Sequence, residues 1–372
     1  MKYFLYIFSS LLFTISTSFA QIDLGIENTL IEDSSSTSDN VLPTDNNAEK
    51  SSITTNLINA FTGDNKDEKE EVITIDGLKE KADAGDVQSQ LDLGYMFLYG
   101  ANGANIDYKQ AILYYEMAAK NKNPVALNNM GSLYFNGIGT DIDYAKAIQY
   151  FEEAANLGSN DAALNLAIIY LGSDNKNKTV DDLKKIHKLL NQAQKSNYSA
   201  KYLLGYSYYT GFLVPQDYIK AFKLIKEAAD NFYDEAQYII SEFYISGNGT
   251  TKNYNQAVKY LRAAATQGHK EAIVKLADIF AEGKMYTKSI TSAHVLYNVA
   301  AVMGAEGAAE KRDALEKQLK IEDLLAVQAR AENFKPEPSK QTLFIRQTFG
   351  NSLKTYIDMN LGNITNIVTD IE

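Results

Sequence analysis

Few side chains of this 372-residue chain are of a type and spacing that could perform chemistry. One segment, Ser173-Asp-Asn-Lys176, contains both the Ser-x-x-Lys and the Ser-Asp-Asn patterns of serine acyl-transfer enzymes such as β-lactamases. In those enzymes the two motifs lie on separate elements that converge on one acyl site, together with a Lys-Thr-Gly motif. Here they overlap within four residues, and Lys-Thr-Gly does not occur. We therefore expect no acyl-transfer site at this segment.

The composition excludes several other kinds of site. Without Cys, the chain cannot form disulfides, thiolate zinc sites or a Cys nucleophile. Its three histidines, His187, His269 and His294, have no carboxylate or serine partner at a catalytic or metal-binding spacing. Adjacent acids such as Glu152 and Glu153 point apart on a helix and cannot act jointly. The sequence thus predicts no enzyme, no metal and no cofactor, and the net charge of −11 offers no surface for nucleic acid.

Residues 1–20 have the pattern of a secretory signal peptide. Lys2 supplies the positive charge, residues 3–15 form an apolar run, and Ser18 and Ala20 are the small residues that precede cleavage before Gln21. An uncleaved anchor is the alternative, but the run is shorter than the roughly 20 apolar residues that a membrane span needs. We therefore expect no membrane span in the mature chain.

Export without disulfides, few arginines and abundant Asn favour the envelope of a Gram-negative, host-associated bacterium. The predicted location is the periplasm or the outer membrane, with secretion from the cell as an open alternative. Gln21 rather than Cys would be the first mature residue, which excludes a lipoprotein anchor at that position.

Most of the negative charge lies just after the predicted cleavage site. Residues 21–72 hold twelve acidic residues and three lysines, a net charge of −9. The stretch 32–52 is rich in Ser, Asp, Asn and Thr and has little apolar surface to bury. We therefore expect residues 21–73 to be a disordered acidic linker.

A repeat begins near residue 89. Its clearest unit reads Ala126-Leu-Asn-Asn-Met-Gly131-Ser-Leu-Tyr-Phe-Asn-Gly137, followed by Asp143-Tyr144 and then Ala154-Ala155-x-x-Gly158. The small residue at the Gly131 position recurs at steps of 36 to 38 residues, as Gly94, Gly131, Ala167, Gly205, Ser241 and Ala277.

Each unit is expected to fold as two antiparallel helices. The first carries apolar or small residues at helical spacing, ends at a glycine such as Gly137, and is followed by an Asp or Asn that caps the second. Small residues in both helices allow close approach. The residues predicted to make this contact are Gly94, Gly131, Gly205, Ala118, Ala119, Ala154, Ala155, Ala228, Ala229, Ala264 and Ala265. Because one hairpin cannot bury its own apolar faces, the units must stack.

The pattern resembles the SEL-one-like repeat, a subclass of the tetratricopeptide family, in its exported bacterial branch. The signature Ala-x-x-x-Leu-Gly-x-x-Tyr-x-x-Gly, Lys-Ala, Ala-Ala-x-x-Gly is almost complete in residues 126–158. The resemblance implies an all-α fold, a right-handed α-solenoid of stacked helical hairpins over residues 74–333. The expected units lie near 88–124, 125–160, 161–198, 199–233, 234–269 and 270–305, with capping helices at 76–85 and 306–333.

The C-terminal residues 334–372 form a separate segment. Two prolines near its start interrupt the array, and apolar residues then recur with a mean spacing of about 3.7, at Ile345, Phe349, Leu353, Ile357, Leu361, Ile364, Val368 and Ile371. We expect an amphipathic tail in which residues 342–372 self-associate or bind the envelope. Docking of the tail on the solenoid is the alternative.

The resemblance also implies where a partner would bind, because the first helix of each unit lines the concave face of such solenoids. The groove positions lie three residues before, one after and four after the small residue. The resulting candidates are Tyr95, Asn128, Phe135, Tyr202, Tyr206, Tyr209 and Tyr238. Tyr combines a large contact area with a polar tip, although such rings could instead pack between neighbouring helices.

These observations predict a non-enzymatic, exported scaffold that binds protein partners, such as an envelope or outer-membrane protein, and supports host interaction or virulence. Two alternatives remain at this point. One is an envelope enzyme or peptidoglycan-associated factor, with β-lactamase-like activity as in some relatives. The other is an adaptor of the eukaryotic secretory pathway.

Overall fold

The computed structural model describes residues 74–172, 178–340 and 342–343. This part of the chain contains fifteen helices and no strand, which confirms the all-α solenoid. The predicted signal peptide, the linker up to residue 73, the Ser173-Asp-Asn-Lys176 segment and the tail beyond residue 343 lie outside the described residues.

Six helical hairpins form the array, each with a first helix, A, and a second helix, B. They are α3 (Val87–Tyr99) with α4 (Tyr108–Lys120), α5 (Pro124–Asn136) with α6 (Tyr144–Asn156), α7 (Asn160–Gly172) with α8 (Val180–Ala193), α9 (Tyr198–Thr210) with α10 (Tyr218–Asp230), α11 (Asp234–Ser246) with α12 (Tyr254–Thr266), and α13 (Lys270–Glu282) with α14 (Ile290–Val302). Helix α2 (Ile75–Asp83) precedes them, and α15 (Ala308–Glu316) and α16 (Ile321–Glu332) follow.

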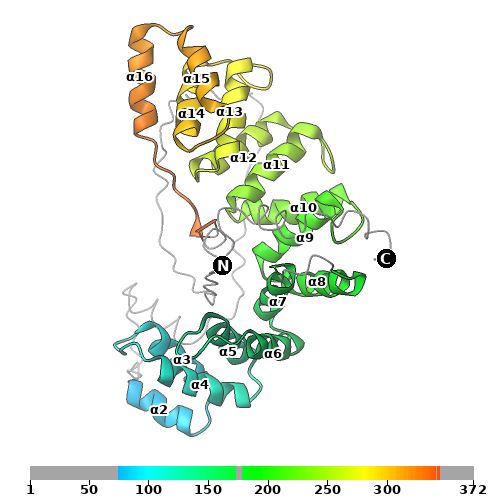
Figure 1. Cartoon of the computed structure of the whole chain (residues 1–372), viewed down its shortest axis with the longest axis vertical. Helices are drawn as coiled ribbons and strands as arrows, with labels where there is room; N and C mark the ends of the chain where they lie inside the picture. The colour runs from blue at the N-terminus through cyan, green and yellow to red at the C-terminus, as the bar shows by residue number, and fades with distance from the viewer. Residues whose placement is uncertain (1–73, 173–177, 341, 344–372) are drawn as a thin grey trace, which may run out of the picture.

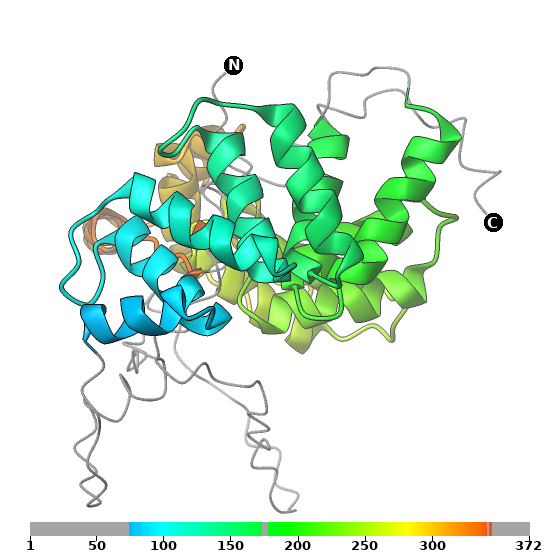
Figure 2. The ribbon, with the colours of Figure 1, turned by 90° about the horizontal axis from the view of Figure 1, so that it is seen from below.

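The hairpins stack into one curved array (Figure 1). Seen from below, the helices of the first hairpins lie side by side (Figure 2). A shared hydrophobic core runs from Leu127 of α5 to Tyr260 of α12. Each hairpin therefore buries its apolar faces against its neighbours, as expected for a solenoid.

Close contact within a hairpin depends on the small residue of helix A. A Cβ added to Gly94, Gly131 or Gly205 would lie 2.6, 2.7 and 2.7 Å from the buried side chains of Tyr115, Phe151 and Ile225, respectively. Of the paired alanines predicted to face these positions, all are buried except Ala119, which is half-buried. Because glycine has no side chain, the side chains of helix B can pack directly on the backbone of helix A.

The turns between helices use the residues that the repeat places there. Gly137 ends α5 with a φ of 67°, a left-handed conformation that costs glycine little. Asp143 then caps α6 through its side chain, which accepts a hydrogen bond from the Lys146 backbone N–H. In the divergent third unit, Thr179 and Asp182 form a capping box at the start of α8 instead.

Among the described residues, no helix combines the length and apolar character needed to cross a bilayer.

After α16 the chain turns back as an extended segment toward the junction of α10 and α11 (Figure 1).

Candidate functional site on the A helices

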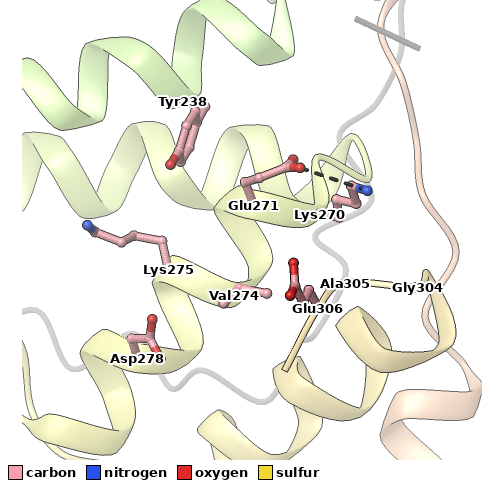
Figure 3. Close-up of a pocket in the computed structure, with 9 residues that line it drawn as sticks. All are labelled: Tyr238, Lys270, Glu271, Val274, Lys275, Asp278, Gly304, Ala305 and Glu306. Carbon is pink, nitrogen blue, oxygen red and sulfur yellow. Dashed lines mark ion pairs between the residues drawn. The ribbon is translucent and has the colours of Figure 1, made fainter. Parts of the chain in front are cut away.

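Successive A helices form an open pocket near the C-terminal end of the array (Figure 3). Its volume is about 550 Å³. The residues that line it are Tyr238, Lys270, Glu271, Val274, Lys275, Asp278, Gly304, Ala305 and Glu306. We call it the α11–α13 pocket, because Tyr238 comes from α11 and five of the other residues come from α13.

This pocket brings groove positions of two units together. Tyr238 lies three residues before the small residue Ser241 of the fifth unit. Val274 and Asp278 lie three before and one after Ala277, the small residue of the sixth unit. Groove positions of units five and six thus line one open pocket.

The pocket carries both signs of charge. Two lysines and three acidic residues line it. Lys275 lies 3.4 Å from Glu242, and Asp278 lies 2.7 Å from Lys311, so these charges are held in place by ion pairs across helices. Glu306 is exposed at the turn before α15. Such a surface can orient a charged partner, although each exposed pair contributes little to stability.

Tyr238 supplies the aromatic wall. Its ring stacks on His269 with centroids 4.8 Å apart and an interplanar angle of 22°. Burial first, and then the negative charges of Glu242 and Glu271, raise the pKa of Tyr238 to about 12. The phenol is therefore protonated at neutral pH and can donate a hydrogen bond to a partner.

Three other predicted groove residues require a correction, because the structure buries them. Tyr202 and Tyr206 are 0% and 5% exposed, and Tyr202 packs edge-on against Tyr233, with ring centroids 4.8 Å apart. Asn128 is 5% exposed, and its side-chain oxygen accepts a hydrogen bond of 2.9 Å from Asn165. In the second and fourth units the neighbouring hairpin covers these positions. These side chains therefore pack between helices instead of facing an open groove.

The remaining candidates, Tyr95, Phe135 and Tyr209, are half-buried and lie in aromatic pairs. Tyr95 meets Tyr99, Phe135 meets Tyr144 and Tyr209 meets Tyr218, with ring centroids 4.7, 5.1 and 6.0 Å apart. Tyr99 and Tyr144 are exposed by 38% and 56%. The Tyr95 and Phe135 pairs give the first two units an aromatic surface, in contrast to the charged pocket of units five and six.

Sequence reasoning missed the charged residues of the pocket. The predicted groove residues end in the fifth unit, whereas the same register in the sixth unit identifies Val274 and Asp278. Glu306 gives no such signal, since it belongs to the turn after the sixth unit.

The histidines have structural roles in the described part of the chain. The Nδ1 of His269 accepts a hydrogen bond from the Ala272 backbone N–H and so caps α13. His294 is fully buried, with Nε2 3.3 Å from a carboxylate oxygen of Glu316. His187 lies within hydrogen-bond distance of Asn191. Over residues 74–172, 178–340 and 342–343, no three His, Asp or Glu side chains are arranged to hold a metal ion.

Comparison with known proteins identifies the repeat. The family model described as "Sel1 repeat" matches residues 87–123, 124–159, 199–231 and 234–269, which are the first, second, fourth and fifth units. A search of curated proteins returned no match.

Two solved structures show the same fold. The first, c5321, is described as a protective antigen present in uropathogenic Escherichia coli strains displaying an SLR fold. It is 22% identical, with 77% of this chain and 58% of that chain aligned and a TM-score of 0.57. The second, a Sel1 repeat protein from Oxalobacter formigenes, is also 22% identical, with 62% of this chain and all of that chain aligned and a TM-score of 0.50.

Proposed function

Because this chain is a Sel1-repeat protein, we propose that it is a non-enzymatic scaffold that binds protein partners along the concave face formed by its A helices. Repeat solenoids of this kind commonly serve as protein-interaction scaffolds. The α11–α13 pocket supports the proposal most directly, because it is an open surface at the register that the repeat assigns to partner contact.

The two ends of this surface favour different parts of a partner. The aromatic pairs around Tyr99 and Tyr144 offer contact area with a polar tip. The α11–α13 pocket offers Lys270, Lys275 and Glu306 for charge recognition. We infer a partner that places an apolar segment on the first two units and a charged segment on the last two.

A pair of charge reversals tests this function. Lys270→Glu with Lys275→Glu makes all charges of the pocket negative, while Lys259→Glu with Lys223→Glu makes the same change at exposed sites on α12 and α10. In affinity capture from the native cell envelope, the pocket variant should retain its partner at least ~10-fold less well, a loss of about 1.4 kcal/mol. The control should capture normally, and both should keep their helical circular dichroism. Equal capture by both variants would remove the α11–α13 pocket as the site.

We further propose that the protein is exported to the envelope of a Gram-negative, host-associated bacterium and supports host interaction. Lys2, the apolar run 3–15 and the small residues Ser18 and Ala20 support export. The description of c5321 as a protective antigen of uropathogenic strains supports the association with a host. N-terminal sequencing of the mature protein from the periplasmic fraction should yield Gln21 first. A mature chain that starts at Met1 in the cytoplasm would contradict export.

A further inference from the structure

Helix α11 lacks the N-terminal cap that its counterparts possess. The other five A helices begin after a residue whose side chain accepts a hydrogen bond from the first turn, namely Asp86, Asn123, Ser159, Asn197 and His269. At the same position before α11 stands Tyr233, which makes no side-chain cap. Its hydroxyl donates instead to Glu235, at 2.9 Å. A helix start without a cap leaves the backbone N–H groups of its first turn without a partner.

Thr342, which lies 108 positions after Asp234, supplies the missing cap of α11. The Asp234 backbone N–H donates a hydrogen bond of 3.1 Å to the side-chain oxygen of Thr342. Thr342 is fully buried there. Its hydroxyl has one proton to donate, and the nearest acceptor is the side-chain oxygen of Gln267, at 2.8 Å. Thr342 therefore acts as a distal cap of α11.

The segment that carries Thr342 contacts two successive turns of the array. We call residues 334–340 and 342 the strap; it is the orange segment that runs from α16 toward the α10–α11 junction (Figure 1). The Glu337 backbone N–H donates to the carbonyl of Thr266, the last residue of α12, at 2.9 Å. The Ser339 backbone N–H donates to the Gln267 side-chain oxygen at 2.8 Å, and the Ser339 hydroxyl donates to the Phe232 carbonyl, after α10.

The strap lies on a surface that we call the notch. The notch is formed by Phe232, Asp234, Gln237, Gln267 and Gly268. The Gln267 side-chain amide donates to the Phe232 carbonyl at 3.0 Å and to Gln237 at 2.9 Å. Its oxygen is thereby aimed at the strap, where it accepts from both Ser339 and Thr342. At Gly268, a Cβ would lie only 2.8 Å from the Pro336 ring, so the glycine makes room for the strap.

The equivalent turns after α4 and α6 lack this arrangement. Gln267 stands two residues before the cap of its A helix, and the residues in the same place are Asn121 after α4 and Leu157 after α6. The Asn121 side chain donates back to the Met117 carbonyl of its own helix, at 3.3 Å. Leu157 has no polar group to offer. The notch is therefore formed by the fifth unit and its junction with the fourth, and the turns after α4 and α6 do not reproduce it.

We propose that the notch is a peptide-binding site for an extended segment of the form Pro-x-Pro-Ser-x-x-Thr, and that the strap is its resident ligand. Recognition rests on the hydroxyls at the Ser339 and Thr342 positions and on the proline that packs on Gly268. The occupied notch completes the cap of α11 and ties the turn after α10 to the turn after α12. The C-terminal segment thus sets the stability of the junction between the fourth and fifth units.

Amide hydrogen exchange in the full-length chain tests this proposal. In the double variant Ser339→Ala with Thr342→Val, the Asp234 amide should exchange at least ~10-fold faster than in the wild type. The first turn of α3, which Asp86 caps, should be unchanged. The variant Thr342→Ser retains a hydroxyl at this position and should keep the protection of Asp234.

A synthetic peptide with the sequence of residues 334–343 supplies the second arm. Added to the double variant, it should restore protection of Asp234, whereas the same peptide with Thr342→Val should not. Unchanged exchange at Asp234 in the double variant would overturn the distal cap. Equal effects of the two peptides would overturn the notch as a peptide-binding site.

Discussion

Single glycines decide how closely the two helices of a hairpin approach. At Gly131 the neighbouring ring of Phe151 occupies the place where a Cβ would stand, 2.7 Å away. Alanine normally stabilises a helix relative to glycine by roughly 1 kcal/mol. At Gly131 we expect alanine to lower the stability instead, because the added methyl group overpacks a contact that has no free space.

The substitution Gly131→Ala should therefore destabilise the protein by about 1–3 kcal/mol. The measurement is the free energy of unfolding from urea denaturation. Gly77→Ala is the matched control, since a Cβ at Gly77 in α2 would meet only the Thr74 hydroxyl oxygen, at 3.3 Å. A Gly131→Ala protein as stable as the control would show that the hairpin does not depend on this contact.

The burial of the tyrosines could not be predicted from their positions in the repeat alone. The repeat register identified Tyr202, Tyr206 and Tyr238 as groove positions, yet the first two are buried and Tyr238 lines a pocket. Tyr202 packs on Tyr233 and Tyr238 packs on His269, so the surroundings of each ring depend on residues outside its own helix. The pattern within one unit does not contain this packing between units.

At the scale of elements, the repeat was highly predictable. Glycines such as Gly137 and caps such as Asp143 stand where the helices end and begin, because these residues satisfy the chain termini of helices locally. The strap was not predictable in the same way. Its contacts join residues up to 110 positions apart, and several of them involve Gln267, at a position that the repeat signature leaves open.

One buried polar pair connects the second and third units. Asn128 of α5 and Asn165 of α7 are 5% and 6% exposed, and their side chains form a hydrogen bond of 2.9 Å. Removing either side chain leaves the other amide buried without this partner, which costs about 1–3 kcal/mol.

We therefore predict that Asn128→Ala and Asn165→Ala each destabilise the protein by about that amount. The double variant should lose less than the sum of the two single losses, because the second substitution removes a group that has already lost its partner. A double-mutant cycle from urea unfolding measures this coupling. Asn156→Ala, at an exposed position of α6, is the control. Strictly additive losses would mean that the pair does not couple the second and third units.

For the whole molecule, the central claim is that the row of A helices is the surface on which a protein partner lies. The aromatic pairs lie at one end of this row and the α11–α13 pocket lies at the other. B-helix positions such as Lys223 and Lys259 are exposed as well, so exposure alone does not identify the binding face.

Site-specific photo-crosslinking in living cells distinguishes these faces most directly. A photoreactive phenylalanine derivative would replace Tyr95 or Glu306 on the proposed face, and Lys223 or Lys259 on the B helices. The account predicts the same crosslinked partner from Tyr95 and Glu306 and none from the two lysine positions. Crosslinks to a partner from the lysine positions, with none from Tyr95 and Glu306, would contradict it.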